Sequence, residues 1–85
     1  MIKRKIVVDL PRGLQSQGAT EFVKKASLFS CEINIIKNDR FVAGKRIMGV
    51  MCLAVRKGDE LLLIADGNDE QKAIEDLTNF LLKKD

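Results

Sequence analysis

The chain contains no histidine, no tryptophan and no tyrosine. The absence of histidine excludes imidazole general-base catalysis, metal binding through histidine and a phosphohistidine intermediate. Four phenylalanines are the only aromatic residues, which leaves few rings on which exposed nucleic-acid bases would stack. The hydrophobic core must therefore be almost wholly aliphatic.

Cysteine is scarce as well, since only Cys31 and Cys52 are present. They form no CxxC pair and have no histidine partner, so they fit neither a zinc site nor a redox motif. We expect buried or half-buried thiols, with a single disulfide as the alternative. No metal and no cofactor is predicted.

Long hydrophobic runs are also missing. The segment Met1-Ile2-Lys3-Arg4-Lys5 leads into an apolar run that is too short for a signal peptide. No stretch approaches the roughly 20 apolar residues that a membrane-spanning helix needs. We therefore expect a cytoplasmic protein that does not bind a membrane.

The composition that remains is typical of one small soluble domain over residues 1–85, with 46% hydrophobic and 32% charged residues. The net charge of +3 is unevenly divided, because residues 1–57 carry a net +8 and residues 58–85 a net −5. This division permits a partner with an acidic surface. Nucleic acid is a weaker alternative, because the chain has no reading motif to accompany the charge.

Hydrophobic periodicity predicts seven elements in the order βαββαβα. They are a strand over 2–10, a helix over 16–28, strands around Ile33-Asn34-Ile35 and Phe41-Val42 joined by a turn at Asn38-Asp39, a helix between Gly44 and Gly58, a strand over 60–65 and a last helix from Asn68 or Asp69. The helices can all pack on one face of the strands, which predicts a two-layer α+β sandwich.

The helices have recognisable ends and buried stripes. Ser16 is the expected N-cap of the first helix, and Lys83-Lys84 at the end of the last helix would complement its dipole. The expected buried residues of the three helices recur at helical spacing. They are Ala19, Phe22, Val23 and Ala26; Ile47, Val50, Met51 and Ala54; and Ala73, Ile74, Leu77 and Leu81.

One segment carries a specific resemblance. Residues 45–55, KRIMGVMCLAV, followed by Gly58, are similar to the KSIMGVMSLGV segment of the HPr family, the phosphocarriers of the bacterial sugar phosphotransferase system. Gly13-Leu14, Phe29, Asn38-Asp39 and Gly67-Asn68-Asp69-Glu70 also fall in register with that family. The resemblance covers essentially the whole chain. It implies an open-faced sandwich in which three helices cover one face of a four-stranded antiparallel sheet.

The family's phosphorylation sites are absent from the chain. Gln15 stands where the family has its phosphorylated histidine, and Ser16-Gln17-Gly18 replace its Ala-Arg-Pro. Arg46 stands at the serine that a kinase phosphorylates in Gram-positive members. The chain resembles the Crh-type regulatory paralogues in having Gln15 but lacks their serine.

The chemistry of these replacements excludes the family's usual reaction at position 15. The nitrogen of a carboxamide is a poor nucleophile because its lone pair is delocalised, so Gln15 cannot take up a phosphoryl group. The simplest interpretation of Gln15 is a polar surface residue without a binding role. Gln17 lacks the cation that would steady the group. A helix N-terminus at Ser16, with one more donor from Gly18, would suit a phosphate or another anion. The alternative is that Ser16 only caps the helix.

Arg46 is unusual at the start of a helix. It offers no acceptor to the first backbone N–H groups and adds a second cation, beside Lys45, to the positive end of the dipole. Three interpretations remain open: the helix begins elsewhere, the Lys45-Arg46 pair meets an anion, or the position drifted after the serine was lost.

The resemblance also implies a docking surface on the first two helices, with an apolar patch at Thr20, Ile47, Met48 and Met51. Arg12, Lys24, Lys45 and Arg46 would ring this patch and favour an acidic partner surface. The helical stripe offers an alternative in which Ile47 and Met51 belong to the core, leaving Met48 as the exposed anchor.

We therefore expect a non-enzymatic binding or regulatory protein whose partners are phosphotransferase-system proteins or a transcriptional regulator. The alternatives are a residual phosphocarrier that uses Ser16, Thr20 or Cys52, a basic nucleic-acid-binding module, and a structural role. The chain would be a monomer or a strand-swapped homodimer.

Overall fold

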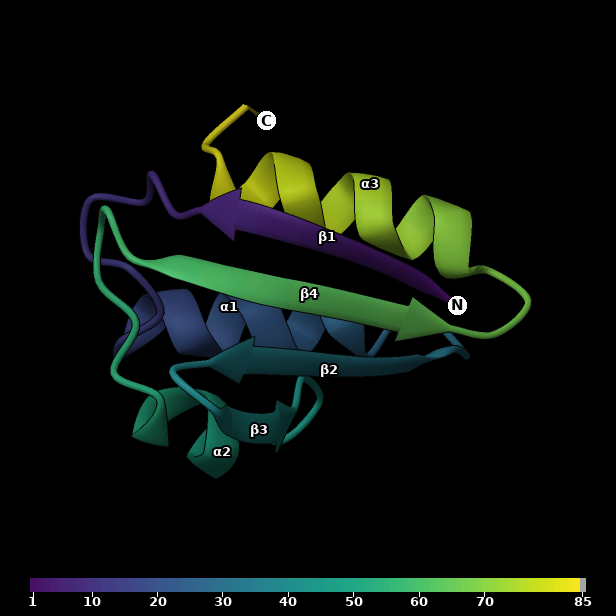
Figure 1. The fold of residues 1–85 in the computed structure, drawn as a ribbon, viewed down its shortest axis with the longest axis horizontal. Coiled ribbons are helices and arrows are strands. Elements are labelled where there is room, and N and C mark those ends of the chain that lie inside the picture. Colours follow the sequence, from purple (N-terminus) through teal and green to yellow (C-terminus); the bar gives the residue numbers. More distant parts are fainter. Residues whose placement is uncertain (85) are drawn as a thin grey trace.

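The computed structural model describes residues 1–84 and contains the seven predicted elements in the predicted order (Figure 1). They are β1 (Ile2–Val7), α1 (Gln17–Ala26), β2 (Glu32–Lys37), β3 (Arg40–Ala43), α2 (Ile47–Cys52), β4 (Glu60–Asp66) and α3 (Glu70–Leu81).

The four strands form one antiparallel sheet in the order β1-β4-β2-β3. Ile6 pairs with Leu61, and Ile35 pairs with Leu63. These four side chains are buried, because alternate residues of a strand point to the same face and paired residues share it. The predicted four-stranded antiparallel sheet is confirmed.

Within residues 1–84, no helix lies in front of the other face of the sheet (Figure 1). Figure 1 shows β1, β4 and β2 in front with α1 behind them, so that the sandwich is open on one side. Val7 lies on this open face and is 56% exposed. The prediction that the helices cover a single face is confirmed.

The core is aliphatic apart from phenylalanine, as expected. Phe22 of α1 is fully buried, and its ring lies 6.4 Å from the ring of Phe80 in α3, centroid to centroid. Ile74 and Leu77 complete the inner face of α3. The two long helices are thus joined by the aromatic pair as well as by the sheet beneath them.

Several predicted boundaries are wrong because backbone groups find partners elsewhere in the fold. The first strand ends at Val7 and not at residue 10, since the N–H of Val8 donates to Asp59 and that of Asp9 to Leu81. The first helix ends at Ala26. Ala54 was expected on the buried stripe of α2 but is exposed, with φ of 52°, beyond the end of that helix.

The cysteines are both free, which contradicts the disulfide alternative. Cys31 is buried as expected, and this burial, with a smaller effect of Asp69, raises the pKa of its thiol to about 11. Cys52 is exposed, so its expected burial is wrong. Cys52 is the last residue of α2 and lies on the outside of the fold.

Asp69 occupies the N-cap position of α3 without capping it through its side chain. Its carboxylate accepts hydrogen bonds from the N–H groups of Ser30 and Cys31, at 2.9 Å each, which lower its pKa. The carboxylate of Asp69 therefore links the start of α3 to the residues that precede β2. Lys83 and Lys84 follow the helix and lie outside its last turn.

Replacing Phe22 by alanine is expected to cost about 3–5 kcal/mol of unfolding free energy, because the ring is fully buried and leaves a cavity. Urea unfolding followed by circular dichroism measures this loss. Phe41→Ala is the matched control, since Phe41 is 61% exposed, and should cost less than about 1 kcal/mol. Equal losses at the two positions would contradict the assigned core.

Candidate functional site

The loop before α1 is anchored against the segment that follows α2. The N–H of Leu14 donates to the carbonyl of Val55 at 2.9 Å, and the Leu14 side chain is fully buried. Gly13 adopts a left-handed φ of 59°, and a Cβ there would overlap with the Val55 carbonyl. Glycine is required for both reasons. Gln15, the residue after this anchor, is exposed at the surface.

The residues after Gln15 use their polar groups locally. Ser16 stands at the N-cap position of α1 with φ of 50° and makes no side-chain capping bond, so its predicted capping role is wrong. Its carbonyl accepts the hydroxyl of Thr20 at 3.3 Å. The N–H of Gly18, predicted as a free donor, is bound to the carbonyl of Gln15. Gln17 donates its amide to Glu21 along α1.

Gly18 also has a packing reason that the sequence did not reveal. A Cβ at this position would overlap with the carbonyl oxygen of Gly13. The two glycines therefore let the start of α1 and the preceding turn approach each other more closely than side chains permit.

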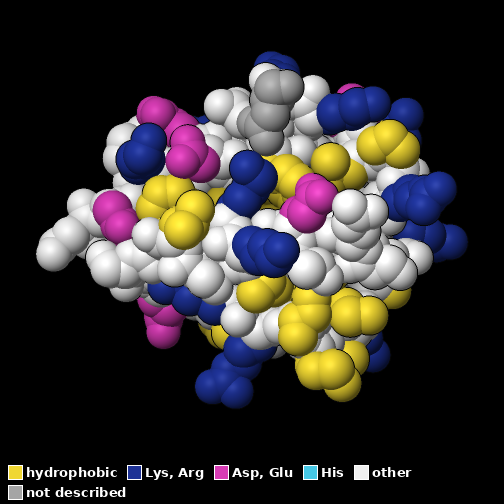
Figure 2. Space-filling model, turned by 180° about the vertical axis from the view of Figure 1, so that it is seen from behind, with side chains coloured by type: hydrophobic (Ala, Val, Ile, Leu, Met, Phe, Trp, Pro, Cys, Tyr) yellow, Lys and Arg dark blue, Asp and Glu magenta, His cyan; other side chains and the backbone are white. Residues whose placement is uncertain are grey.

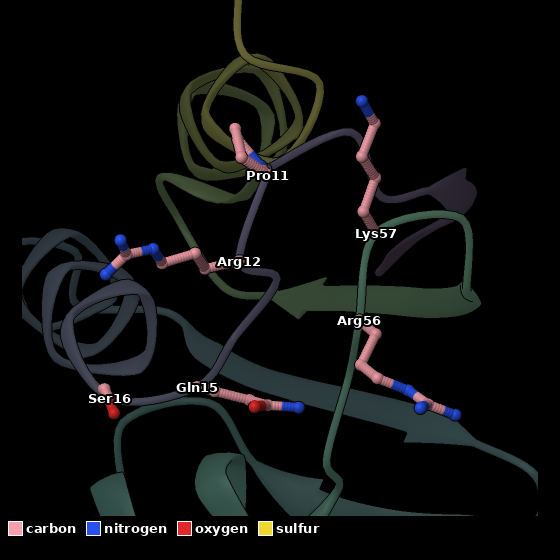
Figure 3. Close-up of a pocket in the computed structure, with 6 residues that line it drawn as sticks. All are labelled: Pro11, Arg12, Gln15, Ser16, Arg56 and Lys57. Carbon is pink, nitrogen blue, oxygen red and sulfur yellow. The ribbon is translucent and has the colours of Figure 1, made fainter.

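Two cations that sequence reasoning missed lie beside Gln15. A surface pocket of about 420 Å³ is lined by Pro11, Arg12, Gln15, Ser16, Arg56 and Lys57 (Figure 3). The loop and the segment after α2 each contribute one side of it. The only signal in the sequence was the adjacent pair Arg56-Lys57 before Gly58, whose position next to Gln15 depends on the Leu14–Val55 hydrogen bond.

A lysine holds the second side of this pocket in place. The Lys37 ammonium donates to the carbonyls of Leu53 and Ala54, at 3.1 Å each, just past the end of α2. It also lies 3.1 Å from the carboxylate of Asp59. Asp59 in turn accepts the backbone N–H of Arg56 at 2.8 Å. The Arg56 bond, followed by the Lys37 contact, lowers the pKa of Asp59.

The start of α2 differs from the expected anion site. Arg46 is the N-cap residue, with extended backbone, an exposed side chain and no side-chain capping bond. The ammonium of Lys45 donates to the carbonyl of Phe29 at 2.6 Å. Lys45 thus binds the turn after α1 and Arg46 is exposed, so the interpretation in which the two cations together meet an anion stays a prediction.

The expected docking residues of α2 are mostly at the surface. Met48 is 71% exposed and Met51 is 44% exposed, so the alternative that placed Met51 in the core is wrong. Ile47 is half-buried against the core, and Val50 is fully buried. Figure 2 shows hydrophobic side chains gathered at the lower right, where α2 lies after the half turn.

α1 packs beside α2 and contributes the polar part of this surface. Thr20 and Lys24 are exposed on α1, and Arg12 is exposed in the loop before it. We define the docking face as the exposed side chains of the loop, α1 and α2, together with the half-buried Ile47. Its members are Arg12, Gln15, Ser16, Gln17, Thr20, Lys24, Arg46, Ile47, Met48 and Met51.

Residues 1–84 contain no cluster of histidine, cysteine or acidic residues that could hold a metal ion. Within the same residues, none of the helices has the length and apolar character needed to cross a bilayer.

Asp59→Asn is expected to lower the urea midpoint at pH 7, because it weakens the contacts with Lys37 and Arg56. A carboxyl group whose pKa is lowered by folding stabilises the fold above its unfolded pKa of about 3.9, and this contribution is lost as the pH falls through the folded pKa. The wild type and the variant should therefore converge as the pH falls below about 3.9 and through the lowered pKa of folded Asp59.

Glu60→Gln serves as the control, since the Glu60 side chain is exposed and makes no hydrogen bond or ion pair within residues 1–84. It should follow the wild type at every pH. A constant difference between wild type and Asp59→Asn from pH 2 to 7 would contradict the assigned role of Asp59.

Comparison with known proteins places these features in a family. Residues 2–83 match the family model described as the PTS HPr component phosphorylation site. The chain is 43% identical to the HPr-like protein Crh of Halalkalibacterium halodurans over 84 residues, which cover 99% of this chain and all of Crh.

Two solved structures show the same fold. HPr from Thermoanaerobacter tengcongensis superimposes with a TM-score of 0.92 at 37% identity, covering 95% of this chain and 91% of that one. Bacillus subtilis Crh, described as a swapped-domain dimer, gives a TM-score of 0.79 at 40% identity, covering 99% and 97%. The chain belongs to the HPr family.

Proposed function

We propose that this chain is a binding or regulatory member of the HPr family that acts through its docking face and carries no phosphoryl group. The observation that carries the proposal is the combination of an exposed methionine patch on α2 with an exposed Gln15 at the family's acceptor position.

The two phosphorylation positions support the first half of this proposal. The chain has no histidine, and a carboxamide at position 15 is not a nucleophile. Arg46 has neither a hydroxyl group nor a charge compatible with the family's serine phosphorylation. Among substitute acceptors, Thr20 already donates its hydroxyl to the Ser16 carbonyl. No observation favours Ser16 or Cys52 as a phosphate carrier.

The surface supports the second half. Methionine side chains adapt their shape to different partners, and the cations Arg12, Lys24 and Arg46 are exposed on the loop, on α1 and at the start of α2. We therefore infer a cytoplasmic protein partner with an acidic docking surface. It is a phosphotransferase-system protein or a transcriptional regulator, in line with the description of Bacillus subtilis Crh as a catabolite repression protein.

We further infer two assembly states, a monomer and a strand-swapped homodimer. Among the described residues 1–84, β1 is an edge strand that pairs only with β4, so it can be exchanged between two copies without disturbing β2 and β3.

Met48→Asp is expected to weaken binding to the partner at least about tenfold, because it places a carboxylate against an acidic surface and removes an apolar anchor. Isothermal titration with enzyme I, HPr kinase, sugar-permease domains and a regulator measures the effect. Val7→Asp is the matched control, since Val7 is equally apolar and lies on the open face of the sheet. The absence of wild-type binding to all of these partners at high micromolar protein would refute the docking proposal.

The mass of the intact protein is expected to stay unchanged after incubation with phosphoenolpyruvate and enzyme I, or with ATP and HPr kinase. A histidine-bearing HPr serves as the control that both enzymes are active. Gain of one phosphoryl group on the wild-type chain would show that a substitute acceptor exists, and peptide mapping would decide between Ser16, Thr20 and Cys52.

A further inference from the structure

The open face of the sheet, which faces the viewer in Figure 1, carries apolar side chains that the core does not use. Leu62 of β4 pairs with Ile36 of β2, and Ile36 pairs with Phe41 of β3. The strand neighbours Leu61 and Ile35 belong to the core, so these three side chains point to the opposite face. Leu62 and Ile36 are half-buried, and Phe41 is 61% exposed. A continuous apolar row therefore crosses three of the four strands at the surface.

A lysine on the fourth strand completes this row. Lys5 of β1 pairs with Leu62, is exposed and has no hydrogen-bond or ion-pair partner within residues 1–84. We call Lys5, Leu62, Ile36 and Phe41 the cross-strand row, in their order across the sheet. It has an unpaired cation at one edge of the sheet, an aromatic ring at the other edge and two aliphatic side chains between them.

The neighbouring residues extend the apolar surface. Ile64 of β4 pairs with Lys3 on one side and with Asn34 on the other, and Asn34 pairs with Ala43. Ile64 is only 8% exposed, yet it lies outside the main hydrophobic core, because its side chain is on the open face. This second row thus repeats the arrangement of the first, with a lysine at the β1 edge and an aliphatic side chain on β4.

We propose that the open face is a homodimer interface on which two copies of the chain pack sheet against sheet. A two-fold axis parallel to the strands, passing between Leu62 and Ile36, brings Leu62 of one copy onto Ile36 of the other. The same rotation places Lys5 of each copy over the Phe41 ring of the other copy. The cross-strand row is thus complementary to itself, with aliphatic contacts in the middle and a cation–π contact at each end.

The lengths of these side chains suit sheet-on-sheet packing. Packed sheets lie about 10 Å apart and are rotated by about 30° against each other because each is twisted. The two sheets are therefore closest at the central strands, which carry Leu62 and Ile36. They diverge at the edge strands, where a lysine and a phenylalanine are long enough to reach across.

The charges on the open face favour this axis over the other two-fold arrangement. An axis across the strands would place Lys5 of one copy against Lys5 of the other, and like charges oppose association. The parallel axis leaves one repulsive contact, between Glu32 of one copy and Asp66 of the other, since these two residues pair at the end of the strands. Both are exposed, so salt screens this repulsion.

The extent of the open face predicts a weak dimer. Four strands of four to seven residues form a face of about 20 Å by 20 Å. Packing two such faces would bury roughly 800 Å² in total, which is at the weak end of specific protein interfaces. The dimer is therefore expected only at high protein concentration. It leaves α1 and α2 uncovered, so it would present two docking faces and bind a partner with two sites more tightly.

Sedimentation velocity tests the association, with interference optics because the chain has no tryptophan or tyrosine for absorbance at 280 nm. The sedimentation coefficient of the wild type should rise between micromolar and millimolar protein and fall again promptly on dilution. A strand-swapped dimer would instead persist after dilution, because β1 must leave its sheet before the two copies can separate.

Variants test the cross-strand row. Phe41→Asp should weaken the association at least about tenfold, because it removes the ring from both ends of the interface. Leu28→Asp is the matched control, since Leu28 is 81% exposed in the turn after α1 and should associate like the wild type. Lys5→Glu and Phe41→Lys should each weaken the association, and the double variant should recover part of it, because an ion pair replaces each cation–π contact. Circular dichroism and urea midpoints establish that each variant is folded.

Isotope-filtered nuclear Overhauser spectra of mixed labelled and unlabelled protein test the orientation of the two copies. Lys5 and Phe41 of one chain are three strand spacings apart, about 14 Å, so the packed dimer is the arrangement that brings the two side chains together. We expect contacts between the Phe41 ring and the Lys5 side chain, recorded at millimolar protein.

Three results would overturn the proposal: a wild-type monomer at millimolar concentration, an association unchanged by Phe41→Asp, or intermolecular contacts confined to α1 and α2 or to an exchanged β1. Signals of the open face that shift only when another protein is added to a monomeric chain would assign the face to that partner and overturn it as well. None of these results decides the docking proposal, which depends on Met48 in the other layer of the fold.

Discussion

The hydrogen bond between Leu14 and Val55 is the contact on which the candidate site depends. It joins the loop before α1 to the segment after α2, two stretches about 40 residues apart in the chain. The contact is possible only because Gly13 has no side chain and tolerates a left-handed backbone. Without it, Gln15 and Arg56 would belong to unrelated parts of the surface.

A second set of contacts gives this junction its rigidity. Lys37 reaches from the end of β2 to the last carbonyls after α2 and to Asp59. The Lys37 side chain thus satisfies carbonyl groups at the C-terminal end of α2, a short helix that has no glycine C-cap, and it orders the turn that follows. Lys45 does the same for the turn after α1. Two cations that contribute to the basic first part of the chain are structural, which explains why net charge alone overestimates the binding surface.

The element order could be predicted from hydrophobic periodicity, because the buried stripes of Phe22, Ile74 and the β-strands are strong local signals. The ends of elements could not, since they are set by hydrogen bonds to distant segments. The N–H of Val8 donates to the carbonyl of Asp59 beyond the end of β1. The carboxylate of Asp69 accepts the N–H groups of Ser30 and Cys31 instead of capping α3. Local propensity does not contain this information.

The same reason explains the errors at the candidate site. The resemblance assigned Gln15 and Arg46 to the family's phosphorylation positions and Met48 to its docking patch. The hydrogen-bond partners of the polar groups around them, however, depend on tertiary contacts. The Ser16 side chain does not cap the helix, the Gly18 N–H is not free, and the Lys45 ammonium binds the carbonyl of Phe29. Arg56 and Lys57 were missed because only the folded chain brings them to Gln15.

The two glycines of the loop have an evolutionary consequence. Any side chain at position 18 would meet the carbonyl of Gly13, and a proline would also lose the N–H that binds Gln15. A histidine restored at position 15 would therefore stand in a loop whose backbone does not accept the family's proline at position 18. Restoring the family's loop sequence therefore requires the backbone around Gly13 to shift as well, so a histidine at position 15 alone would not rebuild the family's loop.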